Sequence, residues 1–155
     1  ITIRLMLKHI TEEYKSENLI ESVHNYISFK DGIVRKGAIS AHHGEKVVIP
    51  LHMGAGIVLG TGKGNKDYNF SAPHGAGRTH GRKEMMRMLD SGDLNMIEFQ
   101  KSMEGIFSTS ISKKTIDESP FAYKDFKDIE VHLKETVNVE QIAKPVFNLK
   151  ADGGD

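Results

Sequence analysis

Short segments rich in β-branched and other apolar residues dominate the chain between residues 19 and 59 and constrain its fold. They run over residues 19–29, 33–39, 46–51 and 56–59, and Gly, Asp or a His-Gly pair separates each from the next. Segments of this length, bounded by turn residues, are typical of β-strands joined by tight connections. This part of the chain therefore predicts a sheet of antiparallel or mixed strands.

Helical patterns occur on either side of this region. Residues 78–90 place Met85 and Leu89 four apart, on the buried side of a helix that closes at Ser91-Gly92. We also expect an amphipathic helix at residues 3–15 and an exposed glycine-lysine loop at 60–69. Later segments predict a strand at 105–111, a helix at 123–136 and a final extended segment at 137–149. The sum is an α+β fold, with mixed or antiparallel strands and a few packed helices.

Length and composition limit the class of protein. At 155 residues the chain fits one domain, which we place at residues 1–151, followed by a disordered tail at 152–155. Lys and Arg balance Asp and Glu at 21 each, so a net charge of zero excludes an overall basic field for nucleic acid. The sequence has no cysteine and no apolar run of membrane-spanning length, which predicts a cytoplasmic protein without disulfides or membrane contact.

A glycine-rich run around one histidine is the main functional signal. Residues 71–79 read Ser-Ala-Pro-His-Gly-Ala-Gly-Arg-Thr. Glycines let backbone N–H groups approach a phosphate, and a helix beginning near Arg78 would point its positive end at the same place. His74 is then a candidate nucleophile for phosphorus, and Arg78 can stabilise the developing charge. The open alternative is a glycine-rich turn that caps a helix and leaves His74 merely exposed.

Cations gather around this run, although the whole chain is neutral. They precede and follow it at Lys63, Lys66, Arg78, Arg82, Lys83 and Arg87, and any contact with RNA must come from this local cluster. The loop around Gly62-Lys63 is not a P-loop, because Ile57 stands where the first glycine is required and Gly64 where a Ser or Thr must bind magnesium. P-loop nucleotide hydrolysis is therefore excluded.

The segment 71–78 resembles the guanylate-accepting histidine motif of the RtcB-type RNA ligases. Further segments match that family in the same order, namely His24-Asn25-Tyr26, Arg35-Lys36-Gly37-Ala38, Ile49-Pro50 with Met53-Gly54, and residues 120–125 and 145–151. The resemblance covers residues 20 to 151. It implies a GTP- and manganese-dependent enzyme that joins an RNA 3′-phosphate or 2′,3′-cyclic phosphate to a 5′-hydroxyl, in tRNA splicing or RNA repair.

The family pattern also implies roles for single residues. His74 would accept GMP, and His24, followed by Asn25, would coordinate Mn²⁺ beside the bound guanylate. Lys36 and Arg78 would act on the reacting phosphate. Together with Arg82, which a helix would place on the same face as Arg78, they would contact the RNA.

Further positions of the pattern would hold the nucleotide. They form a loop, the glycines after the histidine, an aromatic residue beside the guanine and a near-terminal lysine, and here they are Pro50, Leu51, His52, Met53, Gly75, Ala76, Gly77, Tyr123 and Lys150. The loop departs from the family at two places. His52 replaces a small or amide residue, and Ile57 stands where many members have serine.

The family takes its cysteine and most of its metal-binding histidines from a long N-terminal portion, which has no counterpart here. We therefore expect this chain to be the C-terminal part of such a ligase, with the N-terminal portion, GTP and RNA as its partners. The alternative is a non-catalytic remnant that binds RNA or nucleotide, or that pairs with a separate chain carrying the metal ligands.

Overall fold

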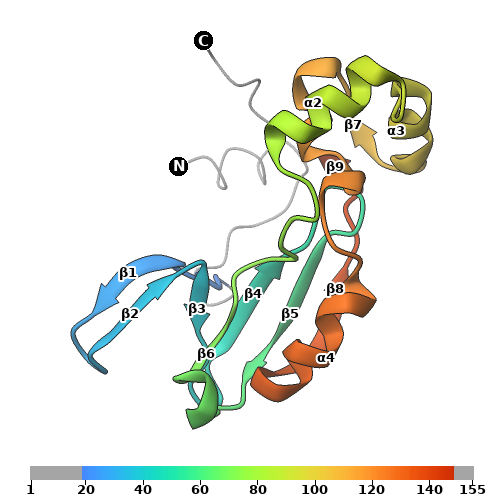
Figure 1. Ribbon diagram of the computed structural model, residues 1–155. Helices are drawn as coiled ribbons and strands as arrows, with labels where there is room; N and C mark the ends of the chain where they lie inside the picture. The colour runs from blue at the N-terminus through green and yellow to red at the C-terminus, as the bar shows by residue number, and fades with distance from the viewer. Residues whose placement is uncertain (1–18, 149–155) are drawn as a thin grey trace.

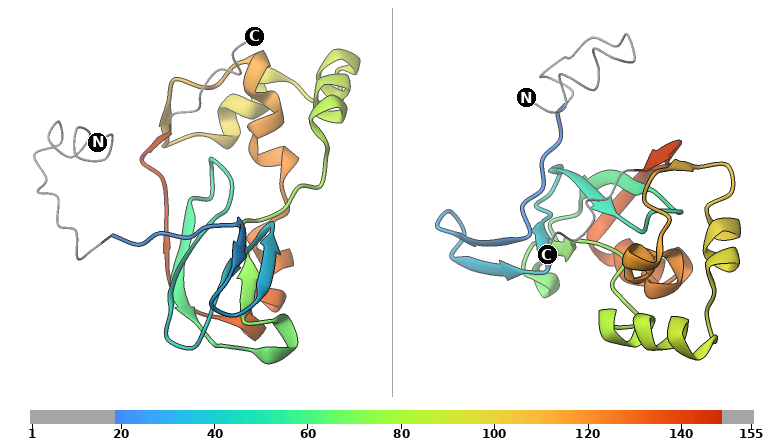
Figure 2. Two further views of the ribbon diagram at one scale, coloured as in Figure 1. Left: turned by 90° about the vertical axis from the view of Figure 1, so that its left-hand side faces the viewer. Right: turned by 90° about the horizontal axis from the view of Figure 1, so that it is seen from above.

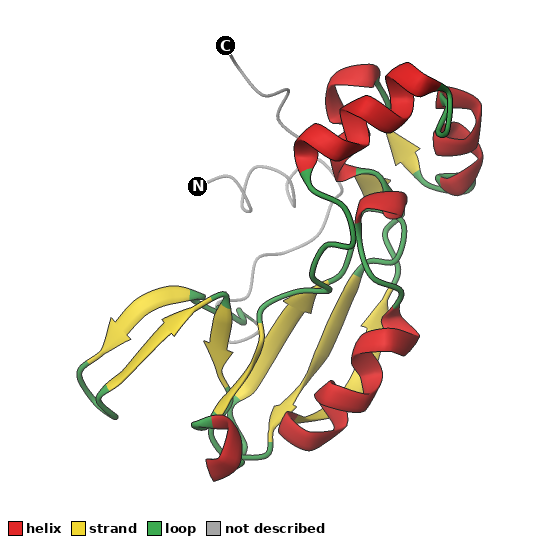
Figure 3. Cartoon of the chain, in the orientation of Figure 1, coloured by secondary structure: helices red, strands yellow, loops and turns green. Residues whose placement is uncertain are grey.

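The computed structural model describes residues 19–148, which form a sheet-rich part and a helical part (Figures 1 and 3). The sheet-rich part contains β1 (Asn25–Ser28), β2 (Ile33–Lys36), β3 (Ala38–Ser40), β4 (Lys46–Pro50), β5 (Ile57–Gly62), the 3₁₀-helix η2 (Lys66–Tyr68), β6 (Ser71–Pro73), α4 (Phe126–Thr136) and β8 (Val137–Ala143). The helical part contains α2 (Arg82–Ser91), α3 (Met96–Ser102), β7 (Phe107–Ser108), the 3₁₀-helices η3 (Lys113–Glu118) and η4 (Pro120–Ala122), and β9 (Phe147–Asn148). The expected α+β fold is confirmed.

Strand pairing is mostly antiparallel. β1 and β2 form a hairpin, β3 pairs with β6, and β5 lies between β4 and β8 in a three-stranded sheet. The hairpin projects from one side of the molecule, and α4 lies on the other (Figure 1). Seen from the side, the helical part lies beyond one end of the central strands (Figure 2, left). The strand β6 ends at Pro73, so His74 follows directly where the sheet-rich part ends.

Alternation along β4 and β5 explains the first core. Val47, Ile49 and Val58 are fully buried, as period-two apolar positions on one sheet face should be. They pack in one cluster with Ile129 and Leu133 of α4. This cluster, called the sheet core below, also takes in Ala76, so the glycine-rich run is anchored to it immediately after His74.

The expected loop at 60–69 is wrong in its first part, because β5 continues through Gly62. A Cβ atom at Gly60 would lie 2.4 Å from Asn138 O, and one at Gly62 would lie 2.4 Å from His42 O. These glycines therefore permit close backbone packing and are buried within the sheet. Sequence reasoning took them for loop flexibility, which glycine allows equally well.

A second cluster, the methionine core, fills the helical part. It contains Met53, Met85, Leu94, Phe99, Met103, Ile116 and Ala122. Met85 is fully buried and Leu89 packs against the cluster, and Gly92 ends α2 in the left-handed conformation with φ 84°. These three expectations are confirmed. The expected start of the helix at Arg78 is wrong, because α2 begins at Arg82 with Gly81 as its N-cap.

The helices and strands after α2 are of the expected type, but their bounds differ from the expected ones. α4 begins at Phe126, three residues after the expected start, because the Asp125 side chain caps it by accepting from Lys127 N. β8 and β9 confirm the extended segment, whereas the strand expected at 105–111 shrinks to β7, which pairs in parallel with β9. Among residues 19–148 there is no helix of the length and apolarity needed to cross a membrane. The helix expected at 3–15 and the tail at 152–155 lie outside the described residues.

Candidate functional site

His74 and His24 form a stacked pair at the exposed end of β6. Their ring centroids lie 5.0 Å apart and the ring planes differ by 9°. His74 Nδ1 lies 2.6 Å from the carbonyl oxygen of Gly37. A carbonyl oxygen only accepts, so Nδ1 carries the proton and Nε2 of the neutral ring holds the lone pair. The nitrogen that can attack an electrophile is thus Nε2.

Gly37 connects the two histidines. Its N–H donates to His24 O at 2.9 Å and to Asn25 Oδ1 at 3.1 Å, while its carbonyl accepts from His74. Gly37 has φ 69°, the left-handed region that glycine occupies without strain. A Cβ there would meet His74 Cε1 at an ordinary 3.5 Å, so this position needs glycine for its backbone angle and not for space. Asn25 acts here through the backbone of Gly37.

Lys36 lies next to Gly37, the residue that connects this pair. It is the exposed last residue of β2, directly before Gly37 and opposite Asn25 in the hairpin. The structure therefore brings His24, Asn25, Lys36 and His74 together from three segments that are far apart in the sequence. An exposed lysine at this point is able to contact an anion bound near the histidines.

Arg78 is engaged in a different way from the one expected. It precedes α2 and forms an isolated bridge with Tyr123, so Arg78 and Arg82 do not share a helix face, and that expectation is wrong. The guanidinium donates to Asp117 O at 2.7 Å and to Glu118 Oε1 at 2.5 Å, and it lies 4.8 Å from the centroid of the Tyr123 ring. Arg82 Nε lies 3.3 Å from Asp117 Oδ2. Both arginines face carboxylates in this structure.

A cavity of about 200 Å³ lies beside Arg78, because Glu118 and Tyr123, which contact Arg78, line it. The loop between β4 and β5 supplies one wall, and the full lining is Pro50, Leu51, His52, Met53, Gly56, Ile57, Glu118, Tyr123, Pro145 and Asn148. Sites for whole drug-sized ligands measure about 300–1,000 Å³. The cavity, called the base-sized cavity below, therefore suits a flat ring system and not a complete nucleoside triphosphate.

Two aromatic side chains give this cavity its chemistry. The rings of His52 and Tyr123 lie 6.3 Å apart, and Tyr123 donates to Glu118 Oε2 at 2.7 Å. Burial, followed by the carboxylate of Glu118, raises the pKa of Tyr123 to about 12. Burial lowers the pKa of His52, and its Nδ1 accepts from Gly54 N at 3.3 Å. Both rings are therefore neutral at physiological pH.

Pro50 joins the base-sized cavity to the histidines. It also lines a second cavity of about 290 Å³, together with Ser22, His24, Ile39, Val48 and His74. Gly75 approaches Pro50 so closely that a Cβ atom would lie 3.1 Å from Pro50 O. Leu51 and Met53 are buried and belong to the two cores, so their side chains support the cavity wall. The two cavities thus lie on either side of one residue.

The glycine-rich run is fixed to both cores, which limits its contact with a ligand. Ala76 is buried in the sheet core, so its side chain does not reach the cavities. Gly77 has φ 74° and its carbonyl accepts from Lys124 N at 3.0 Å. Gly75 is thus the glycine of this run that adjoins Pro50. Lys150 lies outside the described residues.

The described residues provide too few donor atoms in one place to hold a metal ion. No group of three or more His, Asp or Glu side chains that could hold a metal ion occurs within residues 19–148. His24 offers one imidazole, and a manganese site normally requires several oxygen or nitrogen donors. The described part of the chain does not by itself fit Mn²⁺.

Sequence reasoning missed two residues near the site, Arg35 and Glu118. The signal for Arg35 was a cation within an alternating strand, with Asp31 four residues earlier. The signal for Glu118 was a carboxylate two residues before Pro120 and five before Tyr123. Neither signal distinguishes a buried partner from a solvated charge until the fold brings the partners together.

Comparison with known proteins assigns the chain to a family. The family model of tRNA-splicing ligase RtcB matches residues 2–151. RNA-splicing ligase RtcB of Escherichia coli K12 is 29% identical over 133 residues, which are 82% of this chain and 31% of that protein. tRNA-splicing ligase RtcB of Aeropyrum pernix is 35% identical over 85 residues, which are 53% of this chain and 17% of that protein.

The α+β fold, with its stacked histidines beside paired cavities, thus occurs in a chain that resembles RNA ligases over most of its length. The chain belongs to the RtcB family of tRNA-splicing ligases. It spans about a third of the length of the Escherichia coli relative, at 31%.

Proposed function

We propose that His74 is the guanylate acceptor of an RNA ligase that joins a 3′-phosphate or 2′,3′-cyclic phosphate end to a 5′-hydroxyl end. The observation that carries the proposal is the stacked His74, whose Nδ1–H is bound to Gly37 O. This contact leaves Nε2 as the nucleophile, beside a cavity that shares Pro50 with a base-sized cavity. The family membership supports the same chemistry.

In the first proposed step His74 Nε2 attacks the α-phosphorus of GTP. A P–N bond forms, the bond to the β-phosphate oxygen breaks, and pyrophosphate leaves. The ring carries positive charge as it attacks, and Gly37 O already accepts a hydrogen bond from Nδ1–H, so it stabilises that charge without rearrangement. The guanine base would occupy the base-sized cavity, whose lining includes His52 and Tyr123, with the phosphates directed past Pro50.

In the second proposed step an oxygen of the RNA 3′-phosphate attacks the phosphorus of the histidine adduct; a 2′,3′-cyclic end must first add water, which breaks the bond from phosphorus to the 2′-oxygen and leaves the 3′-phosphate. The P–N bond breaks and the RNA end becomes activated as a diphosphate to GMP. In the third step the RNA 5′-hydroxyl attacks the activated phosphate, forms the phosphodiester and expels GMP. Lys36, exposed beside Gly37, would neutralise charge on the phosphate under attack.

Other expectations enter as parts of this proposal. When bound, Mn²⁺ would neutralise the phosphates of GTP, and the donors besides His24 would come from outside residues 19–148. Arg78 and Arg82 would contact RNA after leaving their carboxylate partners, and Lys150 would contact the nucleotide. The N-terminal portion of the longer relatives would supply the remaining ligands. A cytoplasmic location and a role in tRNA splicing or RNA repair stay predictions.

The proposal is tested by covalent labelling with GTP carrying ³²P at the α-phosphate, in the presence of Mn²⁺. The full protein, which includes the N-terminal portion, should take up label that is released by acid, as a phosphoramidate is, and His74→Ala in the same protein should take up none. The matched control is His43→Ala, an exposed histidine in the turn before β4. Label retained at the wild-type level by His74→Ala would refute the assignment.

A non-catalytic module is the second candidate, and the departure of the nucleotide loop from the family pattern at His52 favours it. Such a module would bind RNA or nucleotide, or would pair with a separate chain that carries the metal ligands. The ligase proposal predicts that the 155-residue chain alone binds Mn²⁺ weakly and joins no RNA, and that joining appears when the N-terminal portion is supplied in trans. A non-catalytic module joins no RNA in either case. Tight stoichiometric Mn²⁺ on the chain alone would contradict this candidate.

A further inference from the structure

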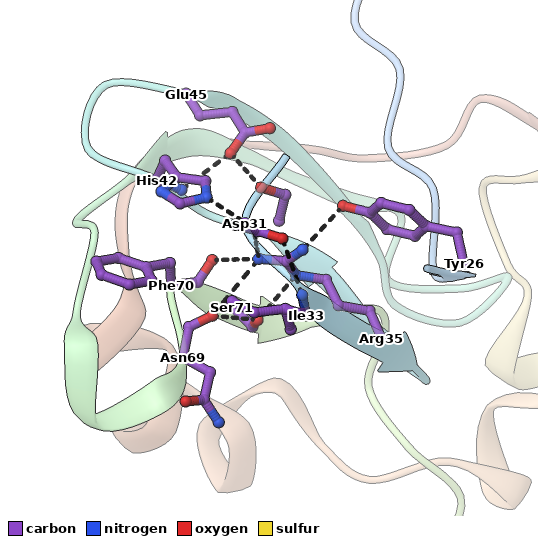
Figure 4. A network of polar contacts seen from close by, with 10 residues as sticks. Tyr26, Asp31, Ile33, Arg35, His42, Glu45, Asn69, Phe70 and Ser71 are labelled. Atoms are coloured by element: carbon purple, nitrogen blue, oxygen red, sulfur yellow. Dashed lines mark hydrogen bonds and ion pairs between the residues drawn. The ribbon is translucent and has the colours of Figure 1, made fainter. Parts of the chain in front are cut away.

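Arg35 is the largest fully buried side chain of the described residues, although it is charged. Its side chain is 1% exposed. Nε donates to Ser71 Oγ at 2.9 Å, Nη1 to Tyr26 OH at 3.2 Å and Nη2 to Asp31 Oδ2 at 2.9 Å. Nη2 also lies 3.4 Å from Phe70 O. Figure 4 shows the guanidinium between these groups, which come from both sides of it.

The partners of Arg35 belong to separate sheets. Tyr26, Asp31 and Arg35 itself are in the β1–β2 hairpin, whereas Ser71 begins β6, which pairs with β3. The guanidinium is therefore a cross-link between the hairpin and the strand that carries His74. The Asp31 carboxylate remains ionised, because hydrogen bonds from Ser28 and Arg35 hold its pKa well below its usual range. The charge of Arg35 is thus compensated inside the fold.

Both ends of the His74 hydrogen bond lie next to this cross-link. On one side, Arg35 precedes Lys36 and Gly37, whose carbonyl accepts from His74 Nδ1. On the other side, Ser71 and Pro73 are the ends of the three-residue strand that leads into His74. The β3–β6 pairing, with Ala38 opposite Pro73, brings Gly37 close to His74, and the Arg35–Ser71 bond adds a tie from the hairpin to the same strand.

Stability alone gives a weak account of such a residue. A buried ion pair gains little over well-packed apolar side chains of similar volume, since desolvation of both charges offsets their attraction. What a planar guanidinium adds is direction, because its five N–H groups point along fixed lines. A hydrogen-bond geometry depends on direction, and the bond from His74 Nδ1 to Gly37 O involves a residue two positions after Arg35.

We propose that Arg35 is a positioning residue, which holds Gly37 O against His74 Nδ1 and so keeps the lone pair on Nε2. The proposal rests on His74 being the guanylate acceptor. Without the cross-link the hairpin, which holds the Gly37 N–H through His24 O and Asn25 Oδ1, shifts Gly37 relative to His74 although β3 stays paired with β6. The Gly37 contact weakens, and the proton distributes between the two ring nitrogens. Fewer molecules then present the nucleophilic tautomer, so guanylylation slows although GTP still binds.

The direct test is ¹⁵N NMR of the histidine rings in wild-type protein, Arg35→Met and the control Lys101→Met, an exposed cation on α3. Wild type and the control should show His74 with the proton on Nδ1. Arg35→Met should show a mixture of tautomers in a protein whose methionine-core signals are unchanged. An unchanged His74 tautomer in folded Arg35→Met would overturn the proposal. This readout needs no activity, so it is independent of whether His74 accepts GMP.

Kinetics supply the second readout. In the labelling assay Arg35→Met should lower kcat at least tenfold and leave the KM for GTP within twofold, and Arg35→Lys should show a smaller loss. Equal loss in KM and kcat would overturn the positioning role. If Arg35→Met does not fold, the same two measurements are made on Tyr26→Phe and Arg35→Lys. A wild-type His74 tautomer and a wild-type labelling rate in both variants would refute the inference. If wild type itself takes no label, the proposed function fails while the tautomer test stands.

Discussion

Replacing Glu118 by glutamine should change the ionisation of Tyr123 in a predictable way. Glu118 accepts one hydrogen bond from Arg78 at 2.5 Å and one from Tyr123 at 2.7 Å. Burial raises the pKa of Tyr123 first, and the Glu118 hydrogen bond and charge raise it further, to about 12. In Glu118→Gln the burial remains and the carboxylate is gone, so this pKa should fall below 12 and stay above 10.

The stability change follows from the same two contacts. A carboxamide has one acceptor oxygen and an NH2 group that only donates, so glutamine replaces one of the two acceptor atoms by a donor and removes the negative charge that faces the Arg78 guanidinium. Hydrogen bonds to charged groups contribute about 1.5–3 kcal/mol, so we expect Glu118→Gln to lose about 2 kcal/mol of unfolding free energy. Because folding raises the pKa of Tyr123, its contribution is complete below about pH 10 and disappears as the pH rises to about 12.

The assay is a titration of tyrosine absorbance at 295 nm, together with urea denaturation. The sequence has 4 tyrosines, so Tyr123→Phe is needed to identify the late transition. Glu104→Gln, an exposed carboxylate just after α3, is the control and should change neither the late transition nor the midpoint in urea. A folded Glu118→Gln protein that still titrates Tyr123 at about 12 would refute the reasoning.

Three further changes have defined outcomes. Burial lowers the pKa of His52, so its contribution to the unfolding free energy should be present above pH 6.5 and be lost as the pH falls. The urea midpoint should therefore decline less between pH 7 and pH 5 in His52→Gln than in wild type. The same decline in both proteins would contradict this. Gly62→Ala should cost at least about 2 kcal/mol, because its Cβ would overlap backbone, whereas Gly81→Ala, with open space around it, should stay within about 1 kcal/mol in the same denaturation. Lys36→Ala in the full protein should lower RNA joining at least tenfold on gels, and unchanged turnover would make Lys36 a solvated charge.

Much of the fold followed from local sequence patterns. The strands β4 and β5 contain short runs of β-branched and other apolar residues bounded by turn residues, and such runs are visible without any partner, whereas the alternation of their burial comes from the fold. The end of α2 at Gly92 was equally visible, because a left-handed residue after a helix is usually glycine. The start of that helix was not, since Arg78 is drawn into the bridge with Tyr123, a residue 45 positions away.

The candidate site was likewise only partly predictable from the sequence. The motif around His74 and the segment with Lys36 identified residues that the fold brings together. Their chemistry depends on Gly37 O, a backbone atom that no side-chain pattern indicates. Arg35 and Glu118 were missed because a charged residue reads as solvated until the fold surrounds it with partners.

Tyr123 packs against both cores, and the base-sized cavity lies where they meet, since Leu51 belongs to the sheet core and Met53 to the methionine core. Within residues 19–148 the chain passes between the two parts at residues 74–81, 123–125 and 144–146. A hinge motion that opened the cavity would have to bend all three connections together, which makes the hinge stiff. A ligand in the base-sized cavity would therefore contact residues of both cores, among them Leu51 and Met53, and would resist such a motion from within.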